Sequence, residues 1–80
     1  MRILNIENNN ALKDIQIFLT PSEAEEMLGD LQRLIKEKKD FNHAHIADQH
    51  YKHEITISIY DNNNISTFNE RARILINKDV

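Results

Sequence analysis

Two short runs of apolar residues near the N-terminus predict strands. They cover residues 2–7 and 11–19, are rich in Ile and Leu, and are separated by the Asn residues at 8–10. Asn tolerates the left-handed backbone conformations that hairpin turns need. The N-terminal segment is therefore predicted to form a β-hairpin.

The second run alternates at the period of a strand, so its side chains divide between two faces. Ile15, Ile17 and Leu19 share the face that we expect in the core, and Phe18 points the other way. An aromatic side chain on that outer face needs a cover, supplied by the C-terminal segment or by something outside the chain.

A capped amphipathic helix is predicted over about residues 20–39. Thr20 and Glu23 have the spacing of a capping box, and Pro21 stands where its missing N–H does no harm. The apolar residues that follow repeat at helical spacing and predict a stripe that packs inward, most simply on the hairpin. The stripe consists of Ala24, Met27, Leu28, Leu31, Leu34 and Ile35.

Two further strands are predicted at residues 42–48 and 53–60, with a short hairpin loop between them. The second alternates strongly, and its core face consists of Ile55, Ile57 and Ile59. Ala44 and Ile46 should join that face, because directly opposed residues of antiparallel strands point to the same side.

The C-terminal segment, residues 66–77, fits two patterns. Thr67 and Glu70 have the spacing of a second capping box, and helix-forming residues follow them. The apolar side of this helix would consist of Phe68, Ala72, Leu75 and Ile76. Alternate residues from Ala72 to Ile76 also fit a strand, which stays the alternative, but the cap favours the helix.

The element order β-β-α-β-β-α predicts an α+β fold, a four-stranded and mainly antiparallel sheet with helices packed on one face. Residues 1–80 are short enough to form one small domain with a single modest core. This order is similar to that of several families of small bacterial proteins, including immunity proteins and antitoxins, which bind and neutralise a partner. The similarity is one of architecture and implies binding without assigning any residue.

Composition narrows the classes of function. The chain has no cysteine, which removes disulfides and thiolate sites and suits a reducing compartment. No run approaches the roughly 18 apolar residues of a membrane span, so we expect a soluble, cytoplasmic protein without membrane contact. The net charge of −3 argues against a nucleic-acid partner, whose phosphates require a basic face. Frequent Asn and Ile suit an AT-rich genome and indicate a bacterial source.

The histidines form the one candidate site. All four lie within residues 43–53, and His43 and His45 point to one face of the predicted strand. Registers that bury Ala44 and Ile46 place His45 opposite Glu54 or Thr56, and His43 opposite Thr56 or Ser58. The outer face of the sheet would then carry Gln16, Phe18, His43, His45, Glu54, Thr56, Ser58 and Tyr60.

The favoured hypothesis is a non-enzymatic interaction module that uses this outer face. Aromatic side chains are enriched in interface cores, and amphipathic rings bury area at little entropic cost. The expected contact residues are Phe18, His43, His45, Thr56 and Tyr60. The partner is another protein or a second copy of the chain in a homodimer.

The alternative hypothesis is a small zinc-binding or zinc-dependent hydrolytic domain. Its ligands would be His43 and His45 with Glu54 or Asp48, and water would fill an open position. A third interpretation makes the histidines ordinary half-exposed sheet residues that bond to neighbours or water. The sequence predicts no catalytic residue, because its single glycine, Gly29, cannot build a phosphate loop and no nucleophile motif occurs.

Overall fold

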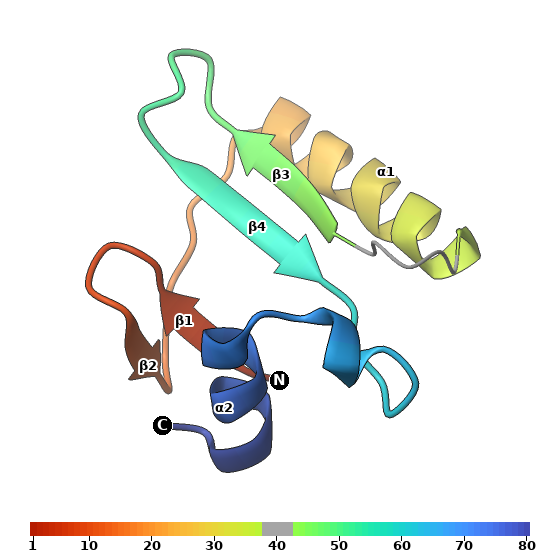
Figure 1. The fold of residues 1–80 in the computed structure, drawn as a ribbon. Coiled ribbons are helices and arrows are strands. Elements are labelled where there is room, and N and C mark those ends of the chain that lie inside the picture. Colours follow the sequence, from red (N-terminus) through yellow and green to blue (C-terminus); the bar gives the residue numbers. More distant parts are fainter. Residues whose placement is uncertain (38–42) are drawn as a thin grey trace. The chain divides into compact units, whose positions relative to one another are not determined.

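The structure is a computed structural model that describes residues 1–37 and 43–80. Figure 1 shows the order of its elements along the chain. They are β1 (Ile3–Asn5), β2 (Asn10–Leu12), α1 (Pro21–Lys36), β3 (His43–Ala47), β4 (Glu54–Ser58), a short 3-10 helix η1 (Ile65–Thr67) and α2 (Glu70–Lys78). The α+β class is confirmed.

Residue contacts divide the chain into two compact units. One consists of Met1–Ile17 with Asn62–Val80, and the other of Phe18–Asp61. The prediction that residues 1–80 form one domain concerns independent folding, which this division does not test. None of the helices in the described part of the chain is long and apolar enough to cross a membrane.

In the unit Phe18–Asp61, α1 begins at the predicted capping box. The Thr20 hydroxyl accepts from the Glu23 amide at 3.2 Å, and the Glu23 carboxylate accepts from the Thr20 amide at 2.9 Å. The helix ends at Lys36, earlier than expected, where the Glu37 amide bonds to the Arg33 carbonyl. The predicted end at residues 38–40 lies outside the described residues.

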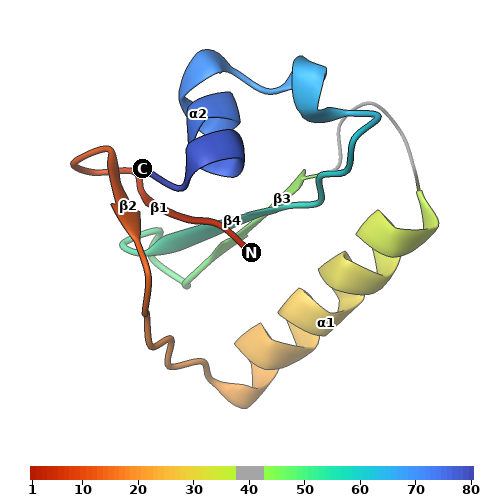
Figure 2. The ribbon, with the colours of Figure 1, turned by 90° about the horizontal axis from the view of Figure 1, so that it is seen from below.

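Strands β3 and β4 pair antiparallel in the same unit and form a hairpin, and α1 lies along one face of it (Figure 2). Ala44 and Ile46 of β3 are buried on that face, as predicted, and so is Leu34 of α1. Ile55 and Ile57 of β4 are half-buried beside them. This small apolar layer fixes which face of the hairpin is left outward.

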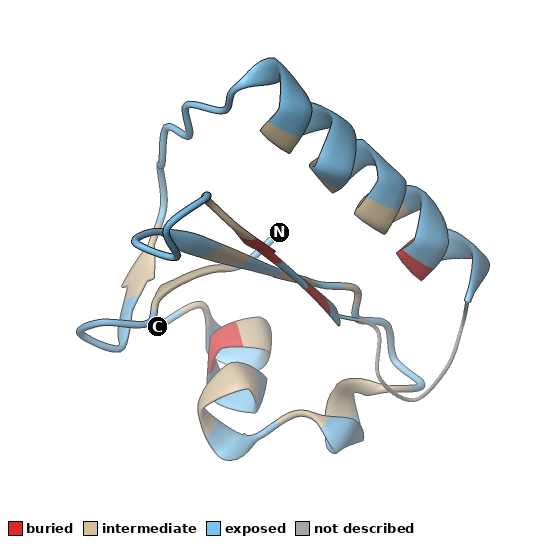
Figure 3. Cartoon of the chain, turned by 90° about the horizontal axis from the view of Figure 1, so that it is seen from above, coloured by how far each residue is buried: buried red, intermediate tan, exposed pale blue. Residues whose placement is uncertain are grey.

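The stripe of α1 is only partly covered, in contrast to the prediction that it packs inward. Leu34 is 5% exposed, but Leu28 is 58% and Ile35 63% exposed. A two-stranded hairpin is narrower than the four-stranded sheet that was expected, so its apolar face contacts one side of the stripe. Figure 3 shows this division along the helix.

In the unit Met1–Ile17 with Asn62–Val80, β1 and β2 pair antiparallel through a turn at residues 6–9, which ends with Asn8 and Asn9. Asn9 takes a left-handed conformation with φ of 63°, and its amide bonds to the Asn5 carbonyl at 2.8 Å. The predicted hairpin is therefore confirmed, but the prediction for its second strand, residues 11–19, is wrong in length. Only Asn10–Leu12 pair with β1.

The rest of that predicted strand, up to Leu19, has no regular structure, and Ile15 and Ile17 are exposed. An alternating pattern of side chains fits an extended backbone, but a strand also needs a neighbouring strand for its backbone hydrogen bonds. Because β1 pairs through three residues, it provides partners for Asn10–Leu12 and not for the residues that follow. The single four-stranded sheet is not confirmed, because the described strands form two separate two-stranded sheets.

The C-terminal segment of the same unit forms the helix α2, as favoured, but with a different cap. The Asn69 side chain accepts from the Ala72 amide at 2.8 Å, whereas the Thr67 hydroxyl donates to the Asn64 carbonyl in η1. Phe68 between them is extended, so Thr67 cannot begin the helix. Leu75 on its apolar side is buried.

Two basic side chains that flank the N-terminal hairpin, Arg2 before β1 and Lys13 after β2, bond to the C-terminal part of the chain. The Arg2 guanidinium donates to the Leu75 carbonyl at 3.1 Å, and Lys13 pairs with Asp79, which takes a left-handed conformation after α2. The hydrogen bond from Lys13 lowers the pKa of Asp79. These bonds fasten α2 to the N-terminal hairpin within one unit.

Candidate functional site

The outer face of the β3–β4 hairpin is the face opposite α1, and the histidines lie on it as predicted. His43 pairs with Ser58 and His45 with Thr56, one of the two register alternatives left open by the sequence. Because Ala44 and Ile46 are buried towards α1, strand alternation sends the two histidines outward. We define the outer face as His43, His45, Glu54, Thr56 and Ser58, all of which are exposed.

His45 stands at the centre of a three-residue group on this face. Its Nδ1 lies 2.7 Å from Glu54 Oε1 and 2.9 Å from the Thr56 hydroxyl. An ionised carboxylate only accepts hydrogen bonds, so Nδ1 carries the proton and donates it. In the neutral ring Nε2 is then an acceptor, and it makes no hydrogen bond within the described residues. The tautomer of an exposed imidazole is thereby set by its neighbours.

His43 and His45 lie side by side at the spacing expected for alternate residues of a strand. Their ring centroids are 5.2 Å apart and the rings meet edge to face, with an interplanar angle of 80°. Each of the two rings therefore has a defined orientation on an exposed surface. Such preorganisation reduces the side-chain entropy that is lost when a partner binds.

The predicted metal ligands do not assemble into a three-ligand cluster. Among the described residues, no group of three or more His, Cys, Asp or Glu side chains could hold a metal ion. The Glu54 carboxylate bonds to His45 Nδ1, so its role is to orient the imidazole and not to serve as a third metal ligand. Asp48, the other predicted third ligand, is engaged in the loop of the hairpin.

The loop between β3 and β4 is organised by the Asp48 carboxylate. Its Oδ1 accepts from the Lys52 amide at 2.8 Å, and its Oδ2 lies 2.6 Å from His53 Nδ1. The hydrogen bond from His53, followed by those from the backbone amides, lowers the pKa of Asp48. The loop has the predicted length, because Asp48 and His53 are themselves bonded through their backbones.

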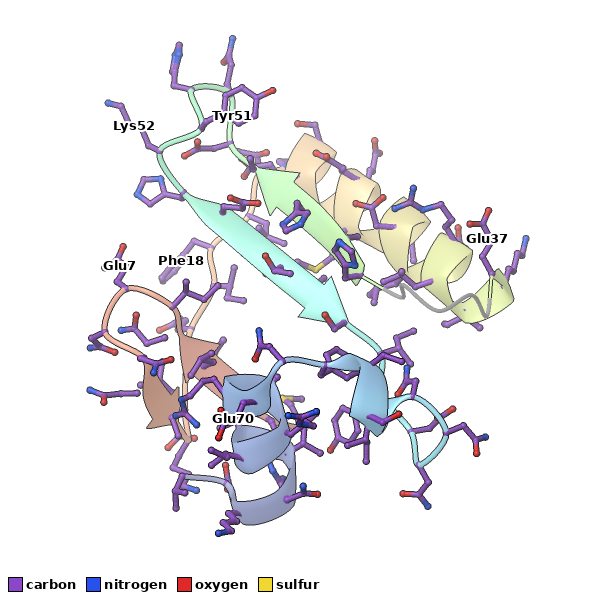
Figure 4. All side chains as sticks on the ribbon, in the orientation of Figure 1. Glu7, Phe18, Glu37, Tyr51, Lys52 and Glu70 are labelled. Atoms are coloured by element: carbon purple, nitrogen blue, oxygen red, sulfur yellow. The ribbon has the colours of Figure 1, made fainter. Side chains whose placement is uncertain are left out.

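The two aromatic residues that the sequence predicts for the contact surface, Phe18 and Tyr60, lie outside the paired strands. Phe18 is 82% exposed, but it lies in the irregular segment before α1, where Figure 4 labels it. Tyr60 follows β4 by two residues and is 37% exposed. Gln16 is likewise outside any strand.

The sequence analysis did not predict that Asp48 pairs with His53. An Asp that begins a loop and accepts from amides further along it is a recognised turn pattern. Asp48 followed by a short polar loop was therefore a usable signal. Tyr51, at the tip of the same loop in Figure 4, has a positive φ of 54° and is exposed.

Comparisons of the chain with protein families, with curated proteins and with solved structures find no match.

Proposed function

We propose that this chain is a non-enzymatic protein-binding module of the cytoplasm, of the immunity-protein or antitoxin kind, whose contact surface is the outer face. The observation that supports the proposal is the group formed by His45, Glu54 and Thr56. It is exposed, bonded internally and fixed in orientation by the register of two strands. Phe18 and Tyr60, which are exposed and lie off the paired strands, stay as proposed contact residues outside the outer face.

The chemistry of the outer face indicates the kind of partner. His45 offers Nε2 as an acceptor, and the Glu54 carboxylate beside it is half-exposed and negative. Both groups favour a partner that donates hydrogen bonds, as arginine, lysine and hydroxyl side chains do. The net charge of −3 adds an attraction for basic surfaces. We therefore propose a protein partner with a basic contact surface.

The test is retention of a partner from cell extract by the tagged full-length chain and by two matched variants. His45→Ala removes the central group and should weaken binding about 10-fold, the effect of losing one to two hydrogen bonds. His50→Ala, in the loop of the same hairpin, should leave binding unchanged. Both variants should melt at the temperature of the wild-type chain, because both side chains are exposed.

Equal retention by all three proteins would show that the outer face is not the contact surface. Loss of binding in His50→Ala alone would move the surface to the loop and contradict the proposal as well. A partner that binds more tightly at high salt would contradict a basic contact surface, because salt screens attraction between charges.

A zinc site is the second candidate, and one observation favours it. The two imidazoles are neighbours, and Glu54 on Nδ1 of His45 leaves Nε2 in the form that binds metals. The remaining ligands would be water or groups of a partner. Stoichiometric zinc should then shift the NMR signals of His43 and His45 and spare those of His50 and His53. Spectra without this selectivity would eliminate the candidate.

A further inference from the structure

The exposed side of α1 is a second surface that the proposed function does not use. The stripe on this helix contains Leu34, buried against the hairpin, and Leu28 and Ile35, which are 58% and 63% exposed. Figure 3 shows the exposed residues along the side of α1 away from β3. Exposed aliphatic residues repeated along one helix mark an interaction surface more often than isolated ones do.

The spacing of these residues fits the seam of a pair of helices. Ala24, Leu28, Leu31 and Ile35 follow one another at steps of four, three and four residues, the repeat of core positions in a two-helix coiled coil. The seam covers most of the 16-residue helix. Ala24, Leu28 and Ile35 are exposed and Leu31 is half-buried at the boundary with the hairpin.

Charges beside the seam determine which direction a partner helix would run. At about 100° per residue, Glu25 and Lys36 lie on the same flank of the seam, near its opposite ends. Both are exposed. If a second α1 ran antiparallel, Glu25 of each copy would stand close to Lys36 of the other. In a parallel pair the same flank of the two helices would fall on opposite sides of the seam, so Glu25 and Lys36 would have no charged partner in the other copy.

We infer that α1 is a self-association surface on which two copies of this chain pair antiparallel through Ala24, Leu28, Leu31 and Ile35. A pair of this kind is isologous, because the same patch serves both copies and a two-fold axis relates them. Four residues of each copy form the seam, so the dimer is weak and depends on concentration. The surface is distinct from the outer face, and either can exist without the other.

The test is the solution mass of the full-length chain over a range of concentrations, measured by sedimentation equilibrium. The wild-type mass should rise from the monomer value of 9.4 kDa towards twice that value. Leu28→Lys should remain a monomer throughout. Glu26→Lys is the matched control, since at about 100° per residue this exposed position lies on the side of the helix opposite the seam. This variant should dimerise like the wild-type chain.

Antiparallel pairing is tested separately by exchange of the flanking charges. Glu25→Lys and Lys36→Glu should each weaken the dimer several-fold, and the double variant should restore it, because the pairing of opposite charges is then re-established. A wild-type chain that stays monomeric at every concentration overturns the inference. So does a dimer that survives Leu28→Lys, and failure of the double variant to recover overturns the antiparallel direction.

Discussion

Asp48 organises the β3–β4 loop by bonding with one carboxylate to an imidazole and to backbone amides. The contact with His53 Nδ1 measures 2.6 Å, and the contact with the Lys52 amide measures 2.8 Å. All of these groups donate to the ionised form of the carboxylate and so favour it over the protonated form. The consequence is a lowered pKa at Asp48.

The lowered pKa gives the loop a defined dependence on pH. Folding lowers the pKa of Asp48 below its ordinary value of 3.8, so ionised Asp48 stabilises the fold fully at pH values above 3.8. That contribution is lost as the pH falls through the folded pKa. Acid should therefore loosen the loop only below pH 3.8.

Replacement of His53 should raise the pKa of Asp48 back towards 3.8, because the hydrogen bond from His53 is the largest cause of the shift. The measurement is an NMR titration of the Asp48 carboxyl carbon in the full-length chain. His50→Ala, in the same loop, is the control and should leave the titration unchanged. An unaltered Asp48 pKa in His53→Ala would mean that the backbone amides alone stabilise the carboxylate.

At the scale of elements, α1 begins where a reciprocal pair of hydrogen bonds satisfies its first amides. Thr20→Ala removes one of these bonds and should lower the free energy of unfolding by about 1 kcal/mol. Urea unfolding followed by helical circular dichroism measures the change. Ser22→Ala, two residues further on, should have a much smaller effect, and equal effects of the two substitutions would contradict the role of the cap.

Elements whose partners are near in sequence were predictable. The capping box at Thr20 fixes the start of α1 through contacts within four residues, and no distant part of the chain is needed to form it. The face of β3 on which the histidines lie followed from parity, because registers that bury Ala44 and Ile46 send His43 and His45 outward. The candidate site could therefore be placed on one face from sequence alone.

Elements that depend on distant partners were not predictable in the same way. The run at residues 11–19 alternates as a strand does, yet its pairing stops at Leu12 because β1 is short. Phe18 then falls outside the sheet, and its expected position on the outer face was wrong. The Thr67 hydroxyl donates to the Asn64 carbonyl in η1 and therefore does not cap α2. The sequence spacing of a capping box does not reveal this competing turn.

At the scale of the whole molecule, both proposed surfaces belong to the unit Phe18–Asp61. The outer face of β3–β4 is assigned to a heterologous protein partner, and the exposed side of α1 to a second copy of the chain. The hairpin separates these surfaces, since α1 lies on one of its faces and the outer face is the other. A variant of one surface should therefore leave the function of the other intact.

The most direct test of the central claim is an amide NMR spectrum of the full-length chain, recorded with and without the partner retained in the extract experiment. If the outer face is the contact surface, the largest shifts occur at His43, His45, Glu54, Thr56 and Ser58. Amides of α1 and of the unit Met1–Ile17 with Asn62–Val80 should change little. Large shifts confined to α1 or to that unit, with the outer face unchanged, would contradict the proposal that the outer face binds the partner.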